Sequence, residues 1–185
     1  MKKLLLSLTC LLCICTAFGQ TPVNFYINYQ TGLSDKEGCK DIVVEMPGKS
    51  AHDIYTSIAF NIGLIYNNPA EVMFGVEDRL VTVAGTDNNL CHVGSESWRT
   101  SYLLRFIIKD GKVLILCPAV RLRQSSLSSQ QISFTDFINQ YWYNKATDTW
   151  VAAEEANMLK CRQGINDLIN KILGITPLGI LPGQW

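Results

Sequence analysis

The segment SYLLRFIIKDGKVLILCPAVRL, residues 101–122, constrains the fold of this chain more than any other stretch. Two runs rich in apolar residues flank Asp110-Gly111, and this dipeptide between alternating runs is the strongest short signal of a two-residue β-hairpin turn. If Asp110 and Gly111 form the turn, Lys109 faces Lys112 and every further cross-strand pair follows. The chain is therefore predicted to build an antiparallel sheet around this hairpin.

This register predicts two different faces for the hairpin. One face is apolar in both arms, so it is predicted to pack on the core, and its residues are Tyr102, Leu104, Phe106, Ile108, Val113, Ile115, Cys117 and Ala119. The second face is half apolar and is lined by Leu103, Arg105, Ile107, Leu114, Leu116 and Val120. A sheet covered on one side is usually polar on the other. A loop or the C-terminal tail therefore covers this face, or it binds a partner or an apolar ligand.

Other segments extend the antiparallel core. Pro118 cannot donate to a strand ladder, so it indicates a sheet edge or a bulge. KDIVVEM, residues 40–46, has a β-branched centre and predicts a strand. EVMFGVEDRLVTVAG, residues 71–85, alternates in two arms and predicts a second hairpin with Glu77-Asp78 at its turn. A loop is expected at 86–98.

Two helices are predicted from apolar positions that recur at spacings of three and four. The first begins after Ser50, whose hydroxyl can cap the helix together with the carboxylate of Asp53. Its apolar stripe is Ile54, Ile58, Ile62 and Ile65. The second helix spans roughly residues 151–173, with Gly174 as its stop, and its stripe is Met158, Cys161, Ile165, Leu168, Ile169 and Ile172.

An aromatic-rich segment, FTDFINQYWYNKATDTW, precedes the last helix at residues 134–150. Aromatic side chains can form a platform for sugars, but in a connecting segment they more commonly anchor it to the domain. The anchoring role is therefore the favoured interpretation.

The order of elements is strand, helix, four strands in two hairpins, and helix (β-α-β-β-β-β-α). Hairpin strands are antiparallel, and both helices must bury their apolar stripes. We therefore expect a two-layer α+β domain whose antiparallel sheet of about five strands carries both helices on one face. This single domain is expected at residues 40–174, after a mobile leader at 20–39 and before an apolar tail at 175–185.

Three of these segments, DIYTSIAFNIGLIY, LVTVAG and LRFIIKDGKVLILCPAVRL, resemble a family of exported domains of unknown function. The family is widespread in Bacteroidetes and is described as having a TATA-binding-protein-like fold. The likeness covers about residues 40–123 and extends loosely through the last helix. The family's first helix usually carries Leu-Tyr near its start and Trp near its end, where this chain has Ile54-Tyr55 and Ile65-Tyr66. The resemblance implies the fold and export; it implies no reaction and no site.

The N-terminus predicts export. Lys2 and Lys3 precede an uncharged stretch, Leu4 to Phe18, which is shorter than the roughly 20 residues that cross a bilayer as a helix. A basic start, a short apolar run and small residues at its end are typical of a secretory signal peptide, with cleavage expected between Gly19 and Gln20. An uncleaved anchor or a lipoprotein is the alternative. We therefore expect a periplasmic or secreted protein without a transmembrane segment after signal removal.

Charge and cysteine content limit the ligands. Removal of residues 1–19 would leave 166 residues with 14 basic and 16 acidic side chains. This lacks the basic footprint of a nucleic-acid binder, so no nucleic-acid partner is expected. The remaining cysteines are isolated and only two histidines are present, so no metal or other cofactor is expected.

In an oxidising compartment these cysteines are expected to form one disulfide or two, or to remain as buried thiols. Four cysteines allow three pairings between which the sequence does not choose. The four are Cys39, Cys91, Cys117 and Cys161.

Two functional hypotheses follow. The first is an exported non-catalytic domain that binds a protein partner or an apolar ligand through the second face of its sheet. The alternative is a small periplasmic or secreted hydrolase that uses His52 or His92 as general base. No hydrolase motif accompanies either histidine, and the adjacent pair Cys91-His92 is poorly placed for catalysis because sequence neighbours rarely reach each other in working geometry. The hydrolase requires a histidine in a cleft beside an acidic or nucleophilic group.

Overall fold

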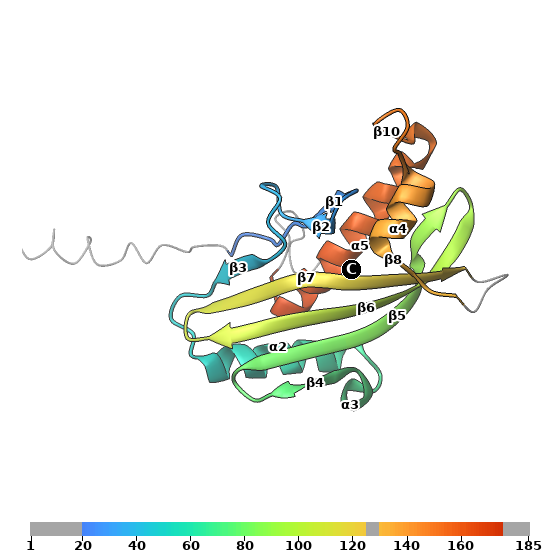
Figure 1. Cartoon of the computed structure of the whole chain (residues 1–185). Helices are drawn as coiled ribbons and strands as arrows, with labels where there is room; N and C mark the ends of the chain where they lie inside the picture. The colour runs from blue at the N-terminus through green and yellow to red at the C-terminus, as the bar shows by residue number, and fades with distance from the viewer. Residues whose placement is uncertain (1–19, 125–129, 176–185) are drawn as a thin grey trace, which may run out of the picture.

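The computed structural model of the chain describes residues 20–124 and 130–175 (Figure 1). Residues 1–19, with the expected signal peptide, and residues 176–185 of the expected tail lie outside the described residues. The main sheet has the strand order β3-β7-β6-β5-β4, and a short strand, β8, also pairs with β7. All its pairs are antiparallel, and the strands are β3 (Ile42–Glu45), β4 (Met73–Val76), β5 (Leu80–Val93), β6 (Glu96–Lys109), β7 (Lys112–Gln124) and β8 (Ile132–Ser133).

The two-layer α+β architecture predicted from the sequence is confirmed. In Figure 1, β5, β6 and β7 run across the front, and the helices α2 (Ala51–Ile65) and α5 (Glu155–Leu173) lie behind them. Ser50 caps α2 in a capping box with Asp53, whose pKa is lowered chiefly by its hydrogen bond with the Ser50 side chain. Gly174 ends α5 in a left-handed conformation. No helix in the described residues is long and apolar enough to cross a membrane.

The Asp110-Gly111 turn has the predicted register, with Lys109 opposite Lys112. Gly111 has φ +73°, a conformation that costs an L-residue roughly 1–2 kcal/mol. The same turn holds the neighbouring elements: the Ala51 N–H, in the first turn of α2, donates to Asp110 Oδ1 at 2.8 Å. The Met46 N–H, just after β3, donates to the Gly111 carbonyl at 2.7 Å.

The hairpin register changes once, and this corrects the prediction for Val120. Between Arg105 and Leu103 the pairing shifts, so that Leu103 faces Ala119 instead of Pro118. The extra residue in β7 is a bulge, as Pro118 indicated. Val120 consequently turns to the core face and is only 6 % exposed, whereas Ala119 turns outward and is exposed.

The bulge also accounts for Cys117, which is half-buried instead of lying in the core. Its N–H donates to Asp41 Oδ1 at 2.9 Å, so this donor is satisfied although the strand ladder is interrupted here. Pro118 lies between the part of β7 that pairs with β3 and the part that pairs with β8. Its missing donor therefore leaves no ladder bond unmade.

The prediction of a loop at 86–98 is wrong. β5 continues to Val93 and β6 begins at Glu96, so the two strands extend together as a long hairpin, which we call the second arm of the sheet. Its pairing is irregular between Asp87 and Cys91. The polar run after Thr86 hides this strand, because Asp87, Asn88 and Asn89 interrupt the apolar alternation before the buried Leu90 and Cys91.

Residues 20–39, expected as a leader outside the domain, contribute to the core. They form the hairpin β1 (Tyr26–Asn28) and β2 (Gly32–Ser34). The buried apolar side chains of this segment are Val23, Phe25 and Leu33. Asn170 and Asn166 of α5 bind the backbone of Val23 and Phe25 through both their amide oxygen and their amide nitrogen, at 2.8–3.0 Å. The two amides therefore satisfy the backbone N–H and carbonyl groups of Val23 and Phe25, as a neighbouring strand would.

The aromatic segment anchors the domain, as favoured from the sequence. It forms α4 (Phe134–Phe137), a π-helix (Ile138–Trp142), β9 (Tyr143–Asn144) and β10 (Thr149–Trp150), and a 3-10 turn (Ala152–Glu154) leads into α5. A short helix, α3 (Pro69–Val72), precedes β4. Phe134, Phe137, Trp142 and Tyr143 are buried, and Phe137 packs edge-on against Trp98 with ring centroids 5.1 Å apart.

Substitution of glycine by alanine is expected to have opposite effects at two positions. Gly111→Ala should lower the free energy of unfolding by about 1 kcal/mol, because open space surrounds Gly111 and only its positive φ is penalised. Gly63→Ala, on the exposed side of α2, should raise it by about 0.5–1 kcal/mol through helix propensity. Urea unfolding of both variants measures this, and equal effects of the same sign would contradict the role of the turn.

Candidate binding surface

An apolar row crosses the whole sheet on the face opposite the helices. The strand register brings together one residue from each of five strands: Val43, Leu114, Ile107, Leu80 and Val76. The two ends of the row are the most open, since Val43 is 55 % and Val76 54 % exposed. The three central side chains are half-buried by their neighbours in the sheet.

Two further rows complete this surface, which we call the open face. The next row holds Leu116, Arg105, Thr82 and Phe74, and the row beyond it holds Ala119, Leu103 and Ala84. Phe74 is 49 % exposed and Arg105 is exposed at the centre. In Figure 1 this face points toward the viewer, and in the described part of the chain no helix crosses in front of it.

The structure thus places five of the six predicted surface residues together. Leu103, Arg105, Ile107, Leu114 and Leu116 lie on the open face, and the apolar members are half-buried. Val120 does not belong to it, as described above. Four large apolar residues of this face were not predicted from the sequence: Val43, Phe74, Val76 and Leu80. The signal for Phe74 and Val76 was present in their alternation, but their face depends on the three-residue turn that places Val76 opposite Leu80.

Arginines extend the open face at the end away from the Asp110-Gly111 turn. Beyond the bulge, strand alternation places Arg99, Arg121 and Arg123 on the same side as Leu103, with Arg99 directly opposite Arg123. Within residues 20–124 and 130–175 none of these guanidinium groups forms an ion pair. The open face therefore combines an apolar centre with arginines that form no ion pair among the described residues.

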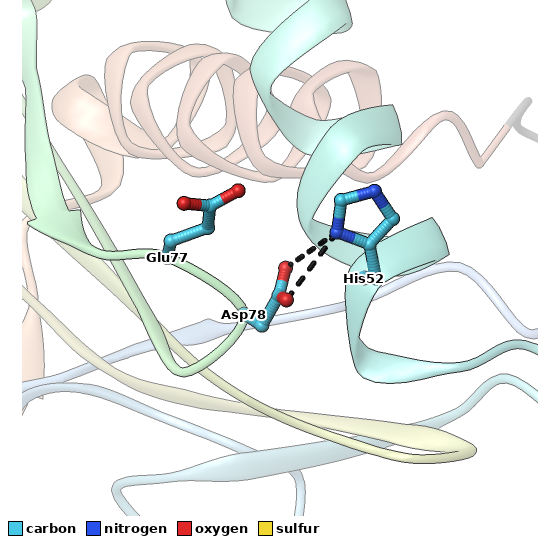
Figure 2. A group of neighbouring side chains, drawn as sticks. All are labelled: His52, Glu77 and Asp78. Atoms are coloured by element: carbon cyan, nitrogen blue, oxygen red, sulfur yellow. Dashed lines mark hydrogen bonds and ion pairs between the residues drawn. The ribbon is translucent and has the colours of Figure 1, made fainter.

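His52 lies away from the open face, in an exposed cluster at the start of α2 (Figure 2). Its Nδ1 is 3.1 Å from Asp78 Oδ1, and Glu77 lies beside this pair in the β4–β5 turn. His52, Glu77 and Asp78 are the described residues that could hold a metal ion, with donor atoms within 4.8 Å of one another. The His52 and Asp78 side chains are 64 % and 39 % exposed, so the contact is solvated and contributes little to stability.

His92 has neighbours of a different kind. Its Nε2 lies 3.0 Å from the Asn89 carbonyl oxygen and 3.2 Å from Lys160 Nζ, and its Nδ1 lies 3.5 Å from Ser97 Oγ. Among the described residues, none of the groups in contact with His92 is a carboxylate, which would be needed to orient the imidazole as a general base. Strand alternation turns the adjacent Cys91 thiol to the other side of β5, where it is buried.

The four cysteines are thiols in the structure and differ in environment. Cys39 is exposed and Cys117 is half-buried, while Cys91 and Cys161 are fully buried. Burial raises the pKa of the Cys117 thiol, and the nearby carboxylate of Asp41 adds to this. The Cys117 thiol donates to the Leu33 carbonyl at 3.5 Å.

Two solved structures share this fold. A TBP-like protein from Parabacteroides distasonis superposes with a TM-score of 0.55 and 13% identity, over 75% of this chain and 91% of that one. A DUF4468 family protein from Bacteroides ovatus superposes with a TM-score of 0.50 and 16% identity, over 75% and 86%. No family model and no curated protein sequence matches the chain. The predicted TATA-binding-protein-like fold is confirmed, and at these identities the likeness shows the fold alone.

Two neighbouring valines in β3 test whether the open face is solvated. Val44→Ala should lower the free energy of unfolding by roughly 2 kcal/mol, because the Val44 side chain is buried in the core. Val43→Ala should change it by less than about 0.5 kcal/mol. Chemical denaturation of both variants measures the difference, and similar losses would show that Val43 is covered in solution.

Proposed function

We propose that this chain is an exported, non-catalytic binding domain that engages a protein partner through its open face. The observation that supports this proposal most strongly is the apolar row of five side chains across the whole sheet, with Val43 and Val76 more than half exposed at its ends. A surface of this kind, with charged residues at its border, is typical of protein–protein contact.

A protein fits the open face better than a small apolar ligand. Small-molecule sites are concave and enclose most of their ligand. Three hollows of about 620–640 Å³ each are lined chiefly by residues off this face, the first of them by Tyr26, Trp150, Met158 and Arg162 among others. The open face presents its apolar side chains on a twisted sheet, which suits a second extended surface.

The charge of the open face narrows the chemistry of the partner. Arg105 sits between Leu116 and Thr82, and the three arginines beyond the bulge carry no ion pair among the described residues. A partner with apolar side chains bordered by carboxylates complements both features, and such complementarity contributes mainly to specificity and to the rate of association.

A hydrolase is the alternative, and the geometry supports it less. A general base needs a reacting group within hydrogen-bond reach and a third group that orients it. His52 is paired with an exposed carboxylate, and His92 lies among a backbone carbonyl, a serine and a lysine. Neither histidine lines any of the three hollows.

Site-specific photo-crosslinking in cells tests the proposal. A photoreactive phenylalanine analogue is placed at Phe74 on the open face, or at Phe60 on α2, which is 66 % exposed. We expect a discrete crosslinked protein from position 74 and none from position 60. Ile107→Asp should abolish the product, because it places an unpaired carboxylate in the apolar row.

Two controls accompany this experiment. Circular dichroism must show that the Ile107→Asp variant is folded. Arg121→Glu, at an exposed position of the open face, should weaken the crosslink and make it less sensitive to salt. Equal products from positions 60 and 74, or no product from position 74, would contradict a specific partner on the open face.

Export is tested separately by fractionation of cells that produce the full chain. The mature protein should leave the cytoplasm and begin at Gln20, because the basic start and apolar run are those of a cleaved signal. N-terminal sequencing reads the cleavage site. Lys2→Glu with Lys3→Glu should slow export, and a cytoplasmic chain that retains Met1 would contradict the proposal.

A further inference from the structure

We propose that Cys91 of β5 and Cys161 of α5 join in a disulfide when the chain folds in an oxidising compartment. The inference rests on the export part of the proposed function and is independent of the open face. Both side chains are fully buried, at 0 % exposure. Cys91 lies in the part of β5 that packs against α5, the helix that carries Cys161.

The strand β5 and the helix α5 pack against each other around the two cysteines. Lys160 Nζ, beside Cys161, lies 3.2 Å from the Nε2 of His92, beside Cys91. One turn farther along α5, a side chain at Gly164 would overlap Leu90 of β5, so glycine permits this close approach. The strand and the helix are therefore held together on both sides of the cysteine pair.

The two thiols are neighbours within this contact. Burial raises the pKa of the Cys161 thiol, and the neighbouring Cys91 thiol adds to the effect. The other two cysteines have different surroundings, since Cys39 is exposed and the Cys117 thiol faces the Leu33 carbonyl. Of the three pairings that four cysteines allow, the geometry selects the one that contains Cys91–Cys161.

The step is a thiol–disulfide exchange with an external disulfide as oxidant. One cysteine thiolate attacks one sulfur of the external disulfide and forms a mixed disulfide with it, while the other sulfur leaves as a thiolate. The second cysteine, after losing its proton, attacks the mixed disulfide and displaces the remaining thiolate. The chain loses two protons and two electrons, and the external disulfide is reduced to two thiols. In the folded protein the buried thiols resist deprotonation, so the bond forms while the chain folds.

The crosslink would close a loop of about 70 residues, which contains β6, β7 and the aromatic segment. A crosslink across a loop of this length lowers the conformational entropy of the unfolded chain and so stabilises the folded protein. For a chain of this size, the oxidised form should melt about 10 °C above the reduced form.

The test uses the full chain in two arms. In the first arm the protein is recovered from the exported fraction of cells; in the second the reduced, unfolded chain is refolded with reduced and oxidised glutathione. Both are treated with iodoacetamide, digested without reductant and analysed by mass spectrometry. We expect the peptides of Cys91 and Cys161 as one crosslinked species, two hydrogens lighter than the sum of the free peptides, and a melting temperature that falls on reduction.

Matched variants define the outcomes. Cys39→Ser with Cys117→Ser should keep the crosslink and the shift in melting temperature, and Cys161→Ser should lose both. Alkylated Cys91 and Cys161 after refolding, or either of them linked to Cys39 or Cys117, would overturn the proposal. If the linked peptide appears after refolding while the protein from cells carries free thiols, the pairing is supported and export is contradicted.

Discussion

The turn at Asp110-Gly111 is the constraint on which the rest of the fold depends. It sets the register of the central hairpin, and the Asp110 carboxylate also accepts the Ala51 N–H at the start of α2. The Gly111 carbonyl accepts the Met46 N–H at the end of β3, and the Gly111 N–H donates to the Lys49 carbonyl. One turn therefore aligns the hairpin, the edge strand and the first helix. Ile54, Ile58 and Ile62 of α2 can then reach the core face only because the helix starts at this point.

The bulge at Cys117-Pro118 divides the open face into two parts with different chemistry. Before the bulge, alternation in β7 turns Leu114 and Leu116 outward; after it, Ala119 and Arg121 point outward while Val120 fills the core. Without the extra residue, Val120 would lie on the open face and Ala119 and Arg121 would face the core. The inserted residue thus keeps the arginines in solvent and the valine buried.

The elements dominated by local signals could be predicted from the sequence, and those that depend on distant partners could not. The Asp-Gly turn, the capping box at Ser50 and the stop at Gly174 each depend on a few adjacent residues, and all three are confirmed. Val23 and Phe25 are buried only because Asn166 and Asn170, more than a hundred positions later, bind their backbone. The apolar row likewise needs the pairing of five strands, so the hairpin alone showed only two of its members, Ile107 and Leu114.

The edges of the sheet favour recognition through side chains over the addition of a strand. A partner that extends a sheet needs a long free edge with unpaired backbone groups. Here the outermost strands β3 and β4 have four residues each, and the part of β5 that extends beyond β4, from Ala84 to Val93, is irregular between Asp87 and Cys91. Gly75 in β4 has φ +155°, and a side chain there would collide with the Leu80 carbonyl, so this edge is closely packed on its neighbour. Short and irregular edges limit unwanted pairing between chains. The exposed large apolar side chains of this sheet, Val43, Phe74 and Val76, lie on its open face, where apolar contact and charge would decide which partner binds.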